Sequence, residues 1–189
     1  LNLKVAKKCF ELKMIYDLLR LIDKFETTGL ICKYLSKTTS LLKNYQSKVK
    51  VKSTTKGDTK LALINAGRCI IIEKGFNHTG IQEVLQAVGV PKGSFYHFFS
   101  NKEEFGLAII DRDAEVHARV IDIYLKDKTL TPLNRLKKYF VSKIEEFESL
   151  EYREGCLFGN LSQEMADQNE RFRSRLQEVT ARWCDRFAE

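Results

Sequence analysis

The chain has 189 residues, of which 43% are hydrophobic and 30% are charged, a balance typical of a globular protein with one or two cores. Its longest apolar runs, such as Cys69 to Ile72, are far below the roughly 18 residues that a membrane span needs, and no signal peptide is recognisable. Five cysteines without a C-x-x-C pair argue against disulfides or a zinc site, and three histidines lack metal-ligand spacing. We expect a cytoplasmic protein without metal or cofactor.

The net charge of +7 is concentrated at one end of the chain. Residues 1–56 hold 13 Lys and Arg against 4 Asp and Glu, whereas residues 57–189 carry a small excess of acid. A basic tail commonly adds sequence-independent attraction to phosphates. The stretch from Ser47 to Lys60 has almost no apolar content and is typical of a linker. Residues 1–56 are a basic arm, a poorly ordered appendage or translated sequence upstream of the natural start, and we favour the last two.

The first regular helix is predicted from Asp58, as its N-cap, to Lys74, with Gly75 at the C′ position. Gly67 lies inside this helix, where glycine costs about 1 kcal/mol relative to alanine. Glycine at this position therefore indicates a softened or closely packed helix. The apolar face of the helix comprises Leu63, Ile64, Gly67, Ile70 and Ile71.

The stretch from Ile81 to Lys102 has the punctuation of a helix-turn-helix. Thr79 and Gln82 have the spacing of a capping box, and an apolar stripe at i, i+3, i+4 and i+7 follows. Gly89 predicts the end of this helix and Pro91 the start of the next one. The stripe consists of Ile81, Val84, Leu85 and Val88.

The second helix, predicted over Pro91–Phe99, has one aromatic face and one polar face. Phe95 and Phe99 lie four residues apart and are expected to be buried together. Lysine and hydroxyl side chains on the other face suit phosphates and base edges, and glycine permits a close backbone approach. Ser100 to Glu103 repeats the capping-box spacing, so a third helix is expected to begin there with Lys102 near a phosphate. The predicted DNA-binding residues are Thr79, Lys92, Gly93, Ser94, Tyr96, His97 and Lys102.

On pattern alone, this stretch could also be a helical hairpin whose aromatic side chains all belong to a core. The run GVPKGSFYHFFSNKEEF, however, resembles the end of the DNA-binding domain of TetR-family transcriptional repressors. The resemblance is strong over about Asp58 to Phe105 and looser to Glu189. It implies an all-α, TetR-like fold, with a helix-turn-helix DNA-binding domain over 57–103 and a helical ligand- or redox-sensing domain over 104–189. It also implies a homodimer that binds double-stranded operator DNA and responds to an inducer.

Four further helices are predicted after the DNA-binding motif. One runs from Glu103 to about Lys126, and the next begins at Thr131-Pro132 as N-cap and N1. A shorter helix begins near Cys156, and an apolar stripe marks the last one. The inward residues predicted for the helix from Glu103 are Phe105, Ala108, Ile109, Val116, Val120 and Ile123, and those for the helix from Thr131-Pro132 are Leu133, Leu136, Phe140, Ile144 and Phe147. Those for the helix that begins near Cys156 are Leu157, Leu161 and Met165, and those for the last helix are Phe172, Leu176, Val179, Trp183 and Phe187.

The segment GCLFGNLS, from Gly155 to Ser162, resembles a Gly-Cys motif in the branch of the family that includes the N-ethylmaleimide-reductase repressors, which respond to electrophiles or oxidants. A cysteine at a helix N-terminus has its reactive thiolate form favoured by the helix dipole. Cys156 is therefore a candidate sensor. The alternative is a small buried hydrophobic residue, which free cysteine usually is.

No phosphate-binding loop, H-E-x-x-H or G-x-S-x-G motif is present, so an enzyme is not expected. The acidic pairs Glu103-Glu104 and Glu145-Glu146 are interpreted as solvated helix faces. The sequence predicts a repressor released from its operator by a small molecule or an electrophile. The alternative is a helical interaction module or repressor fragment that no longer binds operator DNA. We further expect the C-terminal dimerisation helices of the family to be missing and pairing to be weak.

Overall fold

The computed structural model describes residues 56–152 and 154–188, and the predictions for residues 1–55 lie outside this part of the chain. The described residues form helices joined by loops and turns and contain no strand, in agreement with the predicted all-α class. The helices are α3 (Lys56–Lys74), α4 (Ile81–Val88), α5 (Lys92–Phe98), α6 (Lys102–Leu125), α7 (Pro132–Ser149), α8 (Leu157–Met165) and α9 (Glu170–Ala188).

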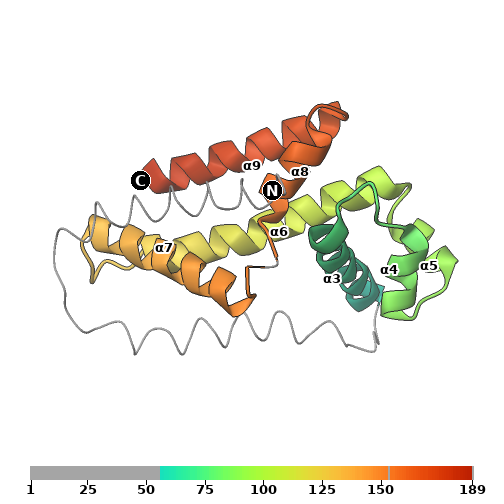
Figure 1. The fold of residues 1–189 in the computed structure, drawn as a ribbon, viewed down its shortest axis with the longest axis horizontal. Helices are drawn as coiled ribbons and strands as arrows, with labels where there is room; N and C mark the ends of the chain where they lie inside the picture. The colour runs from blue at the N-terminus through green and yellow to red at the C-terminus, as the bar shows by residue number, and fades with distance from the viewer. Residues whose placement is uncertain (1–55, 153, 189) are drawn as a thin grey trace.

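The helix α6 is the axis of the arrangement (Figure 1). The helices α3, α4 and α5 gather at its N-terminal end, and α7 packs beside its C-terminal half. The helix α9 runs back along α6, and α8 joins α9 to α3. A shift of α8 can therefore reach α3 directly.

The turn between α4 and α5 forms as the sequence predicts. Gly89 adopts φ +73°, and its N–H donates to the carbonyl oxygens of Leu85 and Gln86. This left-handed C-cap ends α4 because residues with a Cβ are disfavoured there. Pro91 is the N-cap of α5 rather than its first helical residue.

Two predicted capping boxes were displaced by one residue. The N-cap of α4 is Gly80, without a side-chain hydrogen bond, while the Thr79 hydroxyl donates to the Gly75 carbonyl at 2.7 Å. The N-cap of α6 is Asn101, whose side-chain oxygen accepts from the Glu104 N–H at 2.8 Å, so Ser100 is not the cap. Asn101 prevails because asparagine is as good an N-cap as serine and lies one residue closer to the first helical turn. The predicted Thr131 cap of α7 is confirmed.

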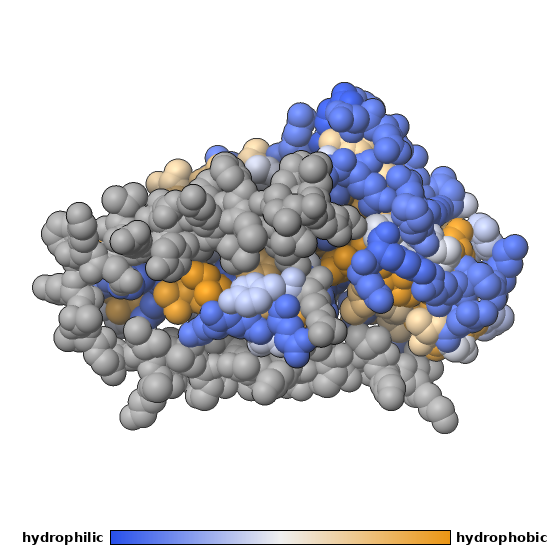
Figure 2. All heavy atoms as spheres, in the orientation of Figure 1, coloured by the Kyte–Doolittle hydropathy of each residue, from blue (hydrophilic) through white to orange (hydrophobic). Residues whose placement is uncertain are grey.

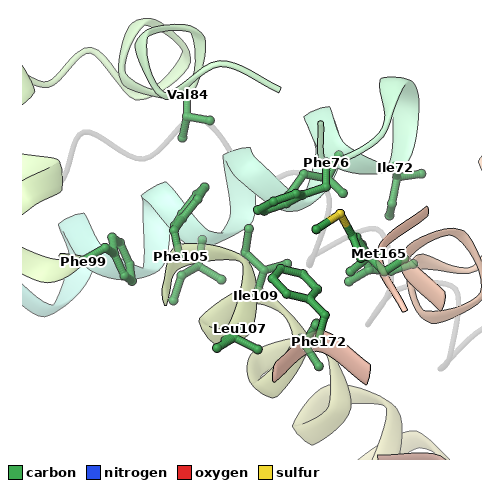
Figure 3. Packing of buried hydrophobic residues seen from close by; sticks show 14 of the residues in the cluster. Ile72, Phe76, Val84, Phe99, Phe105, Leu107, Ile109, Met165 and Phe172 are labelled. Carbon is green, nitrogen blue, oxygen red and sulfur yellow. The ribbon is translucent and has the colours of Figure 1, made fainter. Parts of the chain in front are cut away.

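One hydrophobic core connects the helix-turn-helix with α8 and α9. Its buried members come from α3, α4, α5, α6, α8 and α9 (Figure 3). At its centre, a Cβ added to Gly67 would lie 2.3 Å from Phe105 Cζ and 2.9 Å from Ile109 Cδ1. Gly67 therefore marks a close approach of α3 to α6, which is the second of the two interpretations considered for it.

The predicted apolar faces of α6 and α7 are only partly correct. Ile123 and Leu133 are 52% and 48% exposed, although both were expected to point inward. A single stripe could not describe α6, because α3, α9 and α7 all contact it and lie at different places along and around it (Figure 1). The most buried residues of α7 are Tyr139 and Lys143, whereas Leu136, Phe140, Ile144 and Phe147 are half-buried. Tyr139 forms a second small cluster with Ile121 and Tyr124.

Candidate DNA-contacting surface and thiol site

The helix α5 separates an aromatic core face from a polar outer face. Phe95 and Phe99 are 0% and 3% exposed and pack on Phe105, with ring centroids 5.1 and 4.9 Å from it. The neighbouring Tyr96 is 49% exposed. Burial of Phe95 within the helix and of Phe99 at its C-cap thus fixes which way this short helix faces.

The polar residues predicted on α5 lie together on its outer face. Lys92, Gly93, Tyr96 and His97 are exposed and Ser94 is half-buried. Lys92 Nζ lies 5.9 Å from the Tyr96 ring centroid, so a cation and a phenol are presented side by side. A Cβ added to Gly93 would have no heavy atom within 4 Å, so its surface is open to a close partner.

The remaining two predicted DNA-binding residues lie in the framework behind α5. Thr79 is only 3% exposed, and its hydroxyl holds the connection between α3 and α4. Lys102 Nζ donates to the Asn77 carbonyl at 3.3 Å and lies 4.6 Å from the Phe76 ring centroid. Burial lowers the pKa of Lys102 despite an opposing effect of the Glu164 charge. Thr79 is thus a structural residue in this conformation, and Lys102 touches both the framework and the surface.

The end of the molecule formed by α3, α4 and α5 shows hydrophilic residues interspersed with hydrophobic ones on the face seen in Figure 2. Residues 57–102 hold five Lys and Arg against three Asp and Glu, one of which, Glu83, is paired with Lys74. The remaining balance is mildly positive, which is compatible with contact to phosphates.

Cys156 is the N-cap of α8, as the sequence predicted for a helix beginning near it. Its carbonyl accepts the Asn160 N–H at 2.9 Å, and its thiol makes no capping hydrogen bond. The residue is half-buried against the edge of the core. Partial access combined with the helix N-terminus is the setting in which a thiol can react.

The surroundings of Cys156 include ionisable residues of α7. Burial raises the pKa of Tyr139, and negative charge on nearby Cys156 and Glu146 acts in the same direction. Glu146 in turn accepts from buried Lys143 Nζ at 2.7 Å. The thiol and the partly buried Lys143–Glu146 ion pair thus both lie near the Tyr139 phenol.

His117 of α6 packs against aromatic rings of α8 and α9. Its ring centroid lies 5.0 Å from that of Trp183 on α9 and 6.2 Å from that of Phe158 on α8. Burial lowers its pKa to about 3, and the positive charges of Lys143 and Arg68 contribute. The imidazole is therefore neutral at physiological pH and acts as an aromatic packing residue.

The sequence interpretation missed two polar links between α8 or α9 and the first helices. Glu164 of α8 accepts from the backbone N–H of Phe76 and of Asn77, each at 2.8 Å. Arg171 of α9 donates to both Glu103 and Glu104, each at 2.6 Å, so this acidic pair is not simply solvated. Local patterns cannot reveal such pairs, because their members lie more than sixty residues apart.

Among the described residues, no group of three or more His, Cys, Asp and Glu side chains is placed to hold a metal ion. Over the same residues, no helix combines the length and the hydrophobicity of a membrane span. A groove of about 360 Å³ lies between α6 and α9, with Trp183 and the charged side chains of Asp111, Arg175 and Arg182 on its walls. It offers a second place, besides the Cys156 region, where a small molecule could contact the C-terminal helices.

Two family profiles match successive parts of the chain. Residues 63–109 match "Bacterial regulatory proteins, tetR family", and residues 132–189 match "Tetracyclin repressor-like, C-terminal domain". The first covers the helix-turn-helix and the second covers α7, α8 and α9.

Curated relatives and solved structures agree with these matches. The transcriptional regulator AcuR of Cereibacter sphaeroides is 42% identical over 128 residues, which are 68% of this chain and 58% of that protein. The HTH-type transcriptional repressor NemR of Escherichia coli K12 is 35% identical over 121 residues, or 64% and 60% of the two chains. The chain thus spans about three fifths of the length of these curated relatives.

The structural comparisons give the same picture. A crystal structure of regulatory protein TetR from Rhodobacter sphaeroides matches with a TM-score of 0.62 and 43% identity over 66% of each chain. The reduced form of E. coli NemR matches with a TM-score of 0.56 and 31% identity, over 65% of this chain and 63% of that one.

Proposed function

Because the chain belongs to the TetR family of bacterial transcriptional regulators, we propose that it represses transcription by binding operator DNA through α5 and is released by a chemical signal at Cys156. As a regulator of this family, it is not an enzyme. The observation that carries the proposal is the exposed set Lys92, Gly93, Tyr96 and His97, held outward by the burial of Phe95 and Phe99.

In this proposal α5 enters the major groove. Lys92 and Ser94 approach base edges, while Tyr96, His97 and the α6 N-terminus with Lys102 contact phosphates. Gly93 lets the α5 backbone approach the DNA closely. Thr79 contributes by fixing the α3–α4 connection. Two chains would read the two halves of a pseudo-palindrome, acting in the cytoplasm.

The experiment is to select DNA duplexes with the purified chain from a random pool. The affinity of variants for the selected duplex is then measured. Tyr96→Ala and Lys102→Ala should weaken binding to all sequences, and Lys102→Ala should also reduce the salt slope by about one unit. Glu178→Ala, on the exposed face of α9, is the matched control. Unchanged affinity in both first variants would remove the assignment, and failure to select any duplex would favour the interaction module.

The proposed signal acts on the Cys156 thiolate. With N-ethylmaleimide, the sulfur adds to the maleimide double bond, a C–S bond forms, and water supplies the proton to the adjacent carbon without a leaving group. Because Cys156 is half-buried and packs against the core edge, we expect the added group to displace α8. Its place at the start of α8 and its proximity to Tyr139 support the choice of Cys156.

Two other cysteines in the described helices provide the comparison. Both Cys69 and Cys184 are exposed. Partial desolvation nevertheless raises the pKa of Cys69, which disfavours its reactive thiolate. We expect Cys156→Ser to bind DNA but to resist N-ethylmaleimide, whereas Cys69→Ser and Cys184→Ser should still be released. Release that persists in Cys156→Ser would place the sensor elsewhere.

If N-ethylmaleimide releases neither the parent chain nor any variant, the signal is a non-covalent ligand. The groove between α6 and α9 is the second candidate for this role, because it combines an indole surface with charged groups. Trp183 fluorescence would then report binding.

A further inference from the structure

One carboxylate of the C-terminal helices holds the backbone of the DNA-binding helices. Glu164, next to the last residue of α8, accepts from the N–H groups of Phe76 and Asn77, both at 2.8 Å. Gly75 precedes them at φ +91°, and a Cβ added there would lie 2.9 Å from Glu164 Oε2. The carboxylate is therefore fitted into the connection between α3 and α4.

The same connection orients the cation at the start of α6. Asn77 donates its N–H to Glu164 and accepts Lys102 Nζ on its carbonyl, while the Lys102 ammonium lies on the Phe76 ring. The charge of Glu164 acts on Lys102 as well. Loss of the Glu164 contact would thus affect both the position of α4 and the direction of Lys102.

The helix α8 can carry a displacement from Cys156 to Glu164. It has nine residues, so it is about 14 Å long. Leu157, Leu161 and Met165 fix one side of it in the core. Figure 3 shows Met165, the neighbour of Glu164, beside Phe76 and Phe172. A helix this short and internally hydrogen-bonded is expected to shift as a unit, so movement at its Cys156 end reaches Glu164.

We propose that Glu164 is the positioning residue through which α8 sets the DNA-binding helices. It holds the connection of residues 75–80 so that α5 and Lys102 meet DNA together. Modification of Cys156 moves α8 and withdraws the carboxylate from Phe76 and Asn77. The inference rests on the proposed function, since it needs a DNA-binding protein whose signal enters at Cys156.

The test compares Glu164→Ala and Glu164→Gln with the parent chain and with Glu178→Ala. The DNA is the duplex selected by the parent chain, and the reagent is N-ethylmaleimide. Before modification, Glu164→Ala should bind DNA about tenfold more weakly, within the usual range of coupling between two sites. Glu164→Gln retains an accepting oxygen, so its DNA affinity should lie between those of the parent chain and Glu164→Ala. Glu178→Ala should behave like the parent, because it removes the same charge at a site remote from the connection.

The response to the reagent separates positioning from plain stabilisation. In Glu164→Ala the ratio of affinities before and after modification should shrink to within about twofold, because the contact that the signal breaks is already absent. Hydrogen exchange of the parent chain, followed on a peptide covering residues 75–79, should accelerate after modification and already be fast in Glu164→Ala. A general loss of stability would instead accelerate exchange throughout the core.

Two results would overturn the inference, and a third would separate it from the Cys156 proposal. The first is a Glu164→Ala variant with parent-like affinity and a parent-like response to the reagent. The second is a parent chain that is released from DNA while exchange at residues 75–79 stays constant, a measurement that remains valid if the variants fail to fold. In the third, the parent chain binds DNA but ignores the reagent: the Cys156 proposal then fails, and parent-like affinity of unmodified Glu164→Ala would remove the positioning role as well. A tenfold loss in that variant would support it.

Discussion

At the scale of single residues, Gly67 of α3 and Gly93 of α5 have opposite surroundings. Gly67 faces Phe105 at a distance that excludes a Cβ, and Phe105 is held by Phe95 and Phe99. Alanine would gain about 1 kcal/mol of helix propensity, but overpacking a core costs about 1–3 kcal/mol. We expect Gly67→Ala to lower the free energy of unfolding, as measured by urea denaturation. An increase would show that Phe105 can move aside.

We expect the opposite effect on stability for Gly93→Ala, because no heavy atom lies within 4 Å of a Cβ added to Gly93. The variant should be more stable by up to about 1 kcal/mol, since alanine favours the helix. It should nevertheless bind the selected DNA more weakly if the α5 backbone approaches the groove closely. Thermal melting and a binding titration on the same sample check both halves. Unimpaired binding would remove Gly93 from the proposed contact surface.

The lowered pKa of His117 predicts that the folded chain loses stability in acid. Its folded pKa of about 3 lies below the ordinary value of 6.5, so as pH falls the unfolded chain takes up the proton first. The stabilisation is complete above pH 6.5 and is lost as pH falls toward 3. Between pH 7 and pH 5 this group should cost about 2 kcal/mol. The charged groups acting on it are Lys143 of α7 and Arg68 of α3.

The check on His117 is a difference between two pH profiles of the free energy of unfolding. His117→Asn removes the titrating group, so its profile should be flatter than that of the parent chain by this amount. The absolute stability of the variant does not enter the comparison. Parallel profiles would mean that the imidazole reaches solvent readily in the folded chain.

At the scale of helices, the sequence predicted those features that depend on neighbours along the chain. The left-handed Gly89, the Thr131 cap and the start of α8 at Cys156 are confirmed because each is a local backbone requirement. The exposed Ile123 was misassigned because packing of α3, α7 and α9 on α6 decides its burial. The Glu164 contact could not be predicted, since no local rule pairs a carboxylate with distant backbone amides.

The displaced cap of α6 gives a test at this scale. Asn101 accepts the Glu104 N–H, whereas no capping bond involves Ser100. Asn101→Ala should therefore destabilise the chain by about 1 kcal/mol, the usual cost of losing an N-cap. Ser100→Ala, one residue away and exposed, should change the free energy of unfolding by less than about 0.5 kcal/mol. A larger destabilisation by Ser100→Ala than by Asn101→Ala would show that Ser100 is the N-cap, as predicted from the sequence.

At the scale of the whole molecule, the described helices use their apolar faces within one chain. Phe172, Leu176 and Val179 of α9 are buried in the core shared with α6 and the helix-turn-helix. Phe187 packs on Tyr139 of α7, with ring centroids 5.3 Å apart. The exposed Ile123 and Leu133 are single residues rather than a continuous stripe, and such residues are normal on monomers. No long apolar helix face is thus left among residues 56–152 and 154–188 for a bundle between two chains.

We therefore expect the 189-residue polypeptide to sediment mainly as a monomer. Two linked half-site contacts gain from effective concentration, so a monomer should bind the selected duplex weakly and with a strong dependence on salt. Joining two chains through an added dimeric coiled coil should raise affinity for a duplex with two half-sites by about a hundredfold or more. It should leave affinity for a single half-site unchanged, which is the control. A tight dimer of the unfused polypeptide that protects both half-sites would show that the described faces, or the segment before α3, suffice for pairing.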